Sequence, residues 1–269
     1  MASYQSTPLH RVSLSVADGT SLSVLDFGGG RPLAVFLHGL AGHAGEWTRV
    51  AGAMQPSLGK IAFDQRGHGH SSRRPGDLSR AACVADAVAV IERYTRGRRP
   101  VFLVGQSLGG HTAMLVAARH PELVDRLVMI EASPEGPTAT GIERARRWLR
   151  EWPRPLRTVE SAVDFLGPAA PAWLAGMERR SDGWWPRFDQ DTMLAVMEAA
   201  AGAWWREWDA VGCPTLLVRG QMGWISDQDV ARMLQSGPGA SLETVARAGH
   251  DVHLDAPAAL ARLINAFLV

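Results

Sequence analysis

The sequence predicts an α/β protein in which helices cover a mostly parallel β-sheet. Short apolar runs alternate with helical patterns along most of the chain, as they do in folds of this class. Hydrophobic residues make up 46% and charged residues 20% of the 269 positions, which is the balance of a globular protein with a sizeable core. This length is compatible with one large α/β domain.

The predicted elements follow one another in a regular order. An opening hairpin is expected at 11–16 and 21–27, because Ala17-Asp18-Gly19 provides its turn. Further strands are predicted at the apolar runs 33–37, 60–64, 101–104, 127–130, 215–218 and 242–245. Helices are predicted at 79–95, from Ser107 onward, at about 226–235 and at 257–268.

Residues 133–212 interrupt this alternation and form a predicted insertion. The segment contains no convincing strand, several prolines and many helix formers, and it is too apolar to stay disordered. Two interpretations of its tryptophans remain open: they fill the core of the insertion and its seam with the main domain, or some line an apolar cavity that faces the sheet. Eight of the ten lie here: Trp148, Trp152, Trp173, Trp184, Trp185, Trp204, Trp205 and Trp208.

Charge and cysteine content exclude several classes of protein. Lys plus Arg total 28 and Asp plus Glu total 27, so neither nucleic acid nor an acidic membrane surface is an expected partner. Cys83 and Cys213 are too few for a disulfide scaffold or a cysteine-built metal site. The first ten residues lack a signal-peptide pattern, and no apolar run is long enough to span a membrane. We therefore expect a soluble, reduced, cytoplasmic protein; no oligomeric state follows from the sequence.

The strongest local signal for chemistry is Gly105-Gln106-Ser107-Leu108-Gly109, between a predicted strand and a predicted helix. This is the context of a G-x-S-x-G nucleophile elbow. The chain turns so sharply at Ser107 that side chains two residues away on either side would collide, and Gly105 and Gly109 remove that collision. A serine held at such a turn is a candidate nucleophile.

A serine nucleophile needs a base, and His250 is the candidate. It lies between the last predicted strand and the last predicted helix, so it should reach the same edge of the sheet as Ser107. His253 is the second choice, although packing or capping of the final helix suits it better.

The base in turn needs a carboxylate that orients it, and two positions are candidates. The turn Gly220-Gln221-Met222-Gly223-Trp224 contains no acid, and Asp227 follows it in a segment that is typical of a helix cap. Glu131 ends the predicted strand 127–130 and would need a buried polar partner, which an imidazole N–H would supply. We favour Glu131, because a rigid strand end places its carboxylate.

Two backbone N–H groups are the predicted oxyanion donors. Leu108 is the first residue of its helix, and Leu40 lies in the small-residue loop His38-Gly39-Leu40-Ala41-Gly42.

The loop from Asp64 to Ser71 is interpreted as scaffold in which Arg66 pairs with Asp64. Its histidines, His68 and His70, could in principle bind a metal together with His38 and His43 upstream, but nothing in their spacing defines the geometry of a catalytic zinc site. We therefore expect neither a metal nor another cofactor.

Together these motifs resemble the α/β-hydrolase superfamily over nearly the whole chain outside the insertion. The matching features are His38-Gly39 after a strand, Asp64-x-Arg66-Gly67-x-Gly69-x-Ser71, the elbow at Ser107 and Gly249-His250 near the end. The resemblance implies an eight-stranded, mostly parallel sheet with helices on both faces. Residues 1–132 and 213–269 would form the core, and residues 133–212 a helical cap after the sixth strand.

The resemblance also implies Ser107 as nucleophile, His250 as base, and Leu40 and Leu108 as oxyanion donors. The missing acid after the seventh strand departs from the common pattern. Branches such as the haloalkane dehalogenases carry a glutamate after the sixth strand, where Glu131 stands here. Those enzymes use an aspartate nucleophile, so serine at position 107 disfavours dehalogenation and epoxide opening.

The expected function is a serine hydrolase that cleaves an ester or lactone of a largely apolar small molecule through an acyl-enzyme. Two alternatives stay open: a C–C bond hydrolase or acyl-transfer enzyme acting on a biosynthetic intermediate, and a non-catalytic ligand-binding member of the fold. Labelling by a fluorophosphonate probe would distinguish an enzyme from a binding protein.

Overall fold

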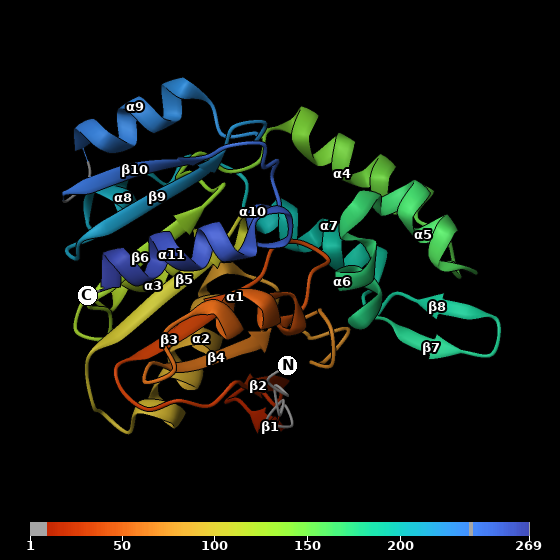
Figure 1. Ribbon diagram of the computed structural model, residues 1–269, viewed down its shortest axis with the longest axis horizontal. Helices are drawn as coiled ribbons and strands as arrows, with labels where there is room; N and C mark the ends of the chain where they lie inside the picture. The colour runs from red at the N-terminus through yellow and green to blue at the C-terminus, as the bar shows by residue number, and fades with distance from the viewer. Residues whose placement is uncertain (1–9, 237–238, 269) are drawn as a thin grey trace, which may run out of the picture.

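The computed structural model describes residues 10–236 and 239–268 and shows the predicted α/β architecture (Figure 1). An eight-stranded sheet has the order β1-β2-β4-β3-β5-β6-β9-β10. Within the described residues, β2 pairs antiparallel with β1 and with β4. All other neighbouring strands of this sheet pair in parallel. The strands are β1 (His10–Ser15), β2 (Ser21–Asp26), β3 (Leu33–Leu37), β4 (Gly59–Asp64), β5 (Val101–Gln106), β6 (Arg126–Ile130), β9 (Thr215–Gly220) and β10 (Ala240–Val245).

Alternate residues of the central strands feed two hydrophobic cores. In β3, Val35 and Leu37 face the core that α2, α3, α8 and α9 cover, while Ala34 and Phe36 face the core that α1, α10 and α11 cover. This two-sided burial is the reason that the strands are almost continuously apolar. The helices of the core are α1 (Thr48–Ala53), α2 (Arg80–Thr95), α3 (Leu108–Arg119), α8 (Trp205–Asp209), α9 (Asp227–Ser236), α10 (Val252–Asp255) and α11 (Pro257–Leu268), and the 3₁₀ helix η1 (Ala44–Trp47) precedes α1.

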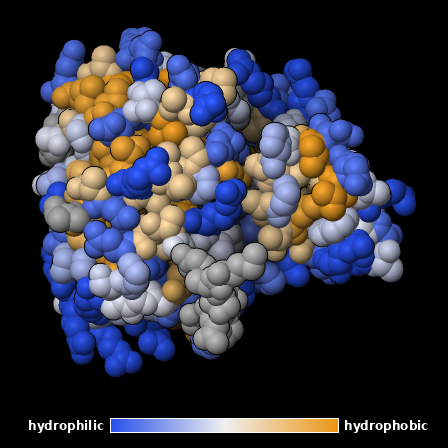
Figure 2. All heavy atoms as spheres, in the orientation of Figure 1, coloured by the Kyte–Doolittle hydropathy of each residue, from blue (hydrophilic) through white to orange (hydrophobic). Residues whose placement is uncertain are grey.

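A second lobe stands beyond the sheet, at the right of Figure 1. It contains α4 (Ala139–Glu151), α5 (Val159–Leu166), η2 (Gly167–Ala169), α6 (Ala170–Ala175), β7 (Glu178–Arg180), β8 (Gly183–Trp185) and α7 (Gln190–Ala199). The space-filling view shows hydrophobic side chains on the visible face of this lobe (Figure 2), and Val159 and Val163 of α5 are exposed.

The expectation that residues 133–212 contain no strand is wrong. β7 and β8 pair as a short antiparallel hairpin. Each tryptophan of β8 is covered by an arginine of β7: Arg179 lies over Trp184 and Arg180 lies over Trp185, with 4.0 and 4.7 Å between guanidinium carbon and ring centroid. These cation–π contacts stabilise strands that are too short for the apolar alternation on which the prediction depends.

The last helix of the predicted insertion 133–212 packs with the main domain, so the lobe ends before residue 212. Helix α8 packs against α3 of the main domain rather than against the lobe, because Trp205 and Trp208 are buried in the principal core. By contrast, Trp148, Trp152 and Trp173 pack together within the lobe, with ring centroids 4.8 to 6.2 Å apart. Among the described residues, no helix combines the length and the apolar character that crossing a membrane requires.

Candidate active site

The predicted nucleophile lies at a strained turn between β5 and α3. Ser107 has φ = 51° and ψ = −120°, a backbone conformation that residues other than glycine rarely adopt. A Cβ on Gly105 would lie 2.4 Å from the carbonyl oxygen of Gly109, and a Cβ on Gly109 would lie 2.3 Å from that of Leu37. Both positions therefore require glycine, as the elbow interpretation expects, and the surrounding structure maintains the strain.

Glu131 directly follows β6, and its buried carboxylate accepts several backbone hydrogen bonds. The N–H of Gly220 donates to Oε1 at 2.9 Å, and the N–H groups of Trp224 and Ile225 donate to Oε2 at 2.6 and 3.4 Å. Burial alone would raise the pKa of Glu131, but hydrogen bonds from His250 and from the Trp224 and Gly220 N–H groups outweigh it and hold the pKa below its usual value. The carboxylate is therefore ionised at neutral pH.

The turn after β9 leaves no room for a side chain at position 223. A Cβ on Gly223 would lie only 2.0 Å from Glu131 Oε1, so the Glu131 carboxylate occupies the space that a side chain at position 223 would need. Asp227, the alternative candidate, points to solvent with its side chain 90% exposed and pairs with Arg219. Of the two candidate acids, only Glu131 contacts His250.

His250 lies in the turn between β10 and α10, where three elements position it. Its Nδ1 is 3.4 Å from Glu131 Oε2, and its ring stacks on Trp224 with centroids 4.1 Å apart and planes 10° apart. The side-chain amide of Gln106 donates to the His250 carbonyl at 3.1 Å. This last bond connects the histidine turn to the residue next to Ser107.

The Ser107 hydroxyl makes no hydrogen bond to the His250 ring within the described residues. In unliganded hydrolases, such contacts are often long and tighten only when substrate is bound. The structure thus brings His250 and Glu131 together directly, and brings Ser107 and His250 to one edge of the sheet through Gln106.

Two residues of this site have no predicted role in the sequence analysis. Trp224 contributes a backbone donor to Glu131 and a stacking surface to His250, although its side chain is 78% exposed. Gln106, the variable residue before the elbow serine, bridges to the His250 turn. The only available signal is their position at the carboxyl ends of β5 and β9, because the carboxyl ends of parallel strands share one edge.

The two predicted oxyanion donors flank the elbow. Leu108 begins α3, so its N–H has no acceptor within the helix. Within the described residues, the Leu40 N–H also has no protein acceptor. A Cβ on Gly39 would lie 3.4 Å from Ser107 Cβ, so the loop that carries Leu40 passes directly beside the serine.

The side chain of His38 holds that loop in place through hydrogen bonds. The N–H of Gln65 donates to His38 Nε2 at 3.0 Å, which leaves the proton on Nδ1 to bond the Gly39 carbonyl at 2.7 Å. Burial lowers the pKa of His38 to about 3 and that of His68 to about 4, so both rings are neutral. Among the described residues, no group of three or more His, Cys, Asp or Glu side chains could hold a metal ion.

His253 occupies a different environment from His250. It is buried, stacks on Trp47 at 4.8 Å, and has its Nε2 3.2 Å from Glu46 Oε2. Burial raises the pKa of Glu46 to about 8 and lowers that of His253 to about 4, so the pair is neutral at pH 7. This packing role agrees with the interpretation of His253 as a structural residue.

The predicted pairing of Arg66 with Asp64 is wrong. Asp64 instead binds Arg11 at 2.6 Å and accepts the N–H groups of Ala44 and His70, so its carboxylate is fully used. Arg66 turns toward α2 and forms a two-pronged, buried ion pair with Asp86, with both N–O distances 2.7 Å. The planar guanidinium group can donate two parallel hydrogen bonds to a carboxylate that lies in the same plane, and Asp86 on α2 provides that carboxylate.

Comparison with known proteins agrees with the fold. Residues 34–263 match the sequence profile of the alpha/beta hydrolase family. Esterase Rv0045c of Mycobacterium tuberculosis is 31% identical over 266 residues, which cover 92% of this chain and 86% of that protein. The sn-1-specific diacylglycerol lipase ABHD11 of Mus musculus is 30% identical over 264 residues, which cover 92% of this chain and 84% of that protein.

Solved structures give the same result for the fold. The crystal structure of E-2-(acetamidomethylene)succinate hydrolase superposes with a TM-score of 0.84 at 23% identity, covering 96% of this chain and 99% of that one. The family profile spans most of the chain, and the sheet has the eight, mostly parallel strands expected from the sequence. The chain belongs to the α/β hydrolase family.

Proposed function

We propose that the protein is a serine hydrolase that cleaves an ester or lactone of a largely apolar small molecule through an acyl-enzyme on Ser107. The observation that carries the proposal is the contact between His250 and the buried, ionised Glu131, at the sheet edge where Ser107 is held in a strained turn. The esterase and lipase names of the relatives support ester hydrolysis as the reaction class.

In the first half-reaction, the Ser107 oxygen attacks the ester carbonyl carbon while His250 Nε2 takes the hydroxyl proton. Glu131 faces Nδ1 and favours the imidazolium that forms. The Leu40 and Leu108 N–H groups would bind the oxyanion of the tetrahedral intermediate. Collapse of the intermediate breaks the bond to the leaving alcohol, which receives its proton from His250.

In the second half-reaction, His250 removes a proton from water, and the resulting hydroxide attacks the acyl carbonyl. The Ser107 oxygen leaves and regains its proton from His250, so the enzyme returns to its starting state with the acid released.

Apolar side chains lie beside the two proposed oxyanion donors. Leu108, Val196 and Ala200 form a buried cluster against which Leu40 and Leu78 pack. Val196 comes from α7, so we propose that the lobe acts as a cap that covers the site. An apolar acyl or alcohol part of the substrate would contact Leu40 and Leu78, the half-buried members of this group.

Replacement of Ser107 by alanine tests this proposal. Hydrolysis of p-nitrophenyl butyrate by the wild type should begin with a burst of p-nitrophenol, and the variant should lose both burst and steady-state turnover. An unchanged thermal unfolding temperature would show that the variant is folded. Turnover retained in a folded Ser107→Ala variant would contradict the assignment of the nucleophile.

A further inference from the structure

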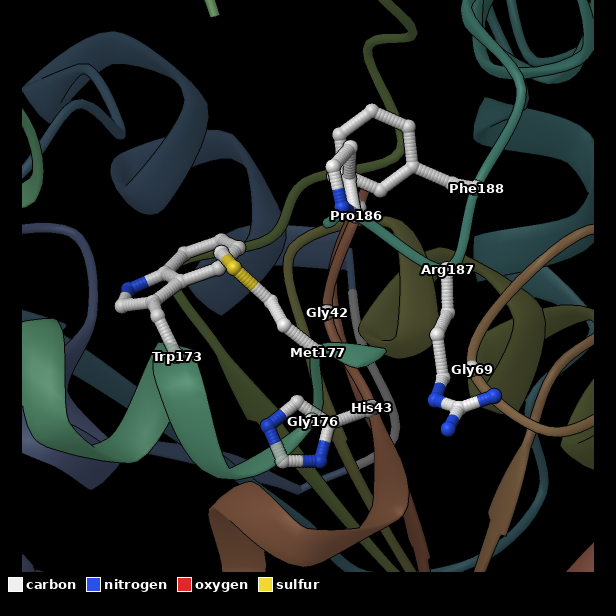
Figure 3. A pocket seen from close by; sticks show the side chains of 10 residues that line it. Gly42, His43, Gly69, Trp173, Gly176, Met177, Pro186, Arg187 and Phe188 are labelled. Atoms are coloured by element: carbon white, nitrogen blue, oxygen red, sulfur yellow. The ribbon is translucent and has the colours of Figure 1, made fainter. Parts of the chain in front are cut away.

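A narrow cleft separates the lobe from the core beside the loop that follows β3 (Figure 3). Ala41, Gly42 and His43 line the core side. Trp173 and Met177 line the other side, together with the segment 186–188. The enclosed part of the cleft, about 10 Å³, has room for about one water, and the rest of the cleft is open to solvent. It can therefore receive only a small part of a ligand.

The cleft adjoins the proposed reaction site through Leu40. The side chain of Leu40 packs against the cluster that contains Ala41 and, in the lobe, Trp152 and Met193. It also packs against the cluster that contains Leu108, the residue after the proposed nucleophile. A chain that extends from the ester group past Leu40 would enter the cleft.

The core wall of the cleft is fixed in place. The N–H of Gly45 donates to His43 Nδ1 at 3.1 Å. The ring proton is therefore on Nε2, which donates to the Ala172 carbonyl at 3.0 Å. A Cβ on Gly176 would lie 2.1 Å from the His43 ring, so the lobe approaches the core closely here. The cleft is therefore preformed on this side.

Arg187 brings to this cleft a positive charge that has no ion-pair partner among the described residues, and in Figure 3 its side chain extends toward Gly69. Its Nε is buried without a hydrogen-bond partner, and no carboxylate of the described residues lies within ion-pair distance of its guanidinium. Nearby acids are bound elsewhere: Glu178 pairs with Arg180 at 3.0 Å and Asp189 with Arg74 at 2.6 Å. A buried donor without an acceptor is costly, so a ligand acceptor here would be favourable.

The chemistry of the cleft indicates the kind of group that would bind. A guanidinium presents parallel N–H donors that match the two oxygens of a carboxylate. The single positive charge of Arg187 matches the single negative charge of a carboxylate more closely than the two negative charges of a phosphate dianion. The apolar surfaces of Trp173, Met177 and Phe188 suit a short methylene chain that leads to the charged end.

We propose that Arg187 is a specificity-determining residue that binds a carboxylate at the end of a short apolar chain of the ester substrate. This inference rests on the proposed esterase function and names the substrate class of that same site. It predicts that the enzyme distinguishes anionic from neutral esters of equal length.

Matched ester pairs test the proposal on the wild-type protein and on Arg187→Ala. The first pair varies the acyl side: mono-p-nitrophenyl adipate against p-nitrophenyl hexanoate. The second pair varies the alcohol side: 4-acetoxybenzoate against 4-methylphenyl acetate. Arg147→Ala, which removes the same charge from the outer face of α4, is the control.

In at least one pair, Arg187→Ala should raise KM for the anionic ester by about tenfold to a hundredfold, the usual range for a hydrogen-bonded charge. KM for the neutral ester should change less than threefold, and Arg147→Ala should leave both esters unaffected. Arg187→Lys, which keeps the charge but loses the fork, should give an intermediate KM. Equal effects of Arg187→Ala on the anionic and the neutral ester in both pairs would overturn the proposal.

A binding measurement separates failure of this inference from failure of the proposed function. If the wild type hydrolyses none of these esters, the esterase proposal fails, while the affinity for adipate and for 4-hydroxybenzoate still tests Arg187. Calorimetry should then show at least one of these carboxylates binding the wild type at least tenfold more tightly than Arg187→Ala. Equal affinities, or no binding to either protein, would overturn the Arg187 proposal.

Discussion

Replacement of Glu131 by glutamine removes the negative charge from His250 while keeping the size of the side chain. The carboxylate accepts hydrogen bonds from three backbone N–H groups and faces His250 Nδ1. An amide has only one acceptor oxygen, so one orientation must be chosen. The least costly orientation places the NH₂ group against the Gly220 N–H and leaves the oxygen facing Trp224 and His250.

The magnitude follows from these contacts. One buried backbone donor, the Gly220 N–H, loses its acceptor, which should lower the free energy of unfolding by about 1–3 kcal/mol. The imidazolium that forms during catalysis then faces a neutral oxygen. In the serine-protease triad, exchange of the acid for its amide costs about ten-thousandfold in kcat. The long 3.4 Å contact here predicts a smaller effect, about a thousandfold.

Steady-state kinetics with p-nitrophenyl butyrate and urea unfolding provide the two measurements. KM should change little, because Glu131 contacts only protein groups. Asp227→Asn is the matched control, since Asp227 is exposed and pairs with Arg219. A kcat for Glu131→Gln within threefold of the wild type, or a larger loss in Asp227→Asn, would refute the reasoning.

Three further predictions concern the neighbours of the site. Trp224→Ala should lower kcat about three- to tenfold with little change in KM, because a stacked aromatic contact is worth about 0.5–1.5 kcal/mol; an unchanged kcat would show that stacking does not position His250. Asp86→Ala leaves the buried Arg66 with only the half-exposed Asp18 as an ion-pair partner, so urea unfolding should show a loss of about 3 kcal/mol in the free energy of unfolding, and a loss below 1 kcal/mol would contradict it. Glu46 keeps a proton in the folded protein up to about pH 8, whereas the unfolded chain releases it near pH 4.5, so the contribution of Glu46 to the free energy of unfolding should fall across this interval. The stability of Glu46→Gln relative to wild type should therefore increase from pH 5 to 8 and then level off, and a constant difference would show that Glu46 titrates normally.

Local patterns were sufficient to predict the main domain. The apolar run at 33–37 is a strand with the predicted limits, because a strand buried on both faces is apolar at every position. The elbow glycines were also predictable, since a side chain at position 105 or 109 would place its Cβ 2.4 or 2.3 Å from a backbone carbonyl oxygen.

Contacts that depend on how helices and loops pack against one another could not be predicted. The Arg66–Asp86 pair depends on how α2 lies against the loop after β4, and spacing along the chain contains no information about that angle. The role of Gly223 was hidden for the same reason: its missing side chain matters only because Glu131, 92 positions earlier, fills the space. The stacking of Trp224 on His250 joins two turns that meet only in the folded protein.

Identification of the residue that reacts with a fluorophosphonate probe tests the central claim most directly. The probe phosphonylates an activated serine, and peptide mass spectrometry locates the modification. The structure predicts a single label on the peptide that contains Ser107, lost in Ser107→Ala and strongly slowed in Glu131→Gln. Absence of label from the folded wild-type protein, or a label on a different serine, would contradict the proposed nucleophile.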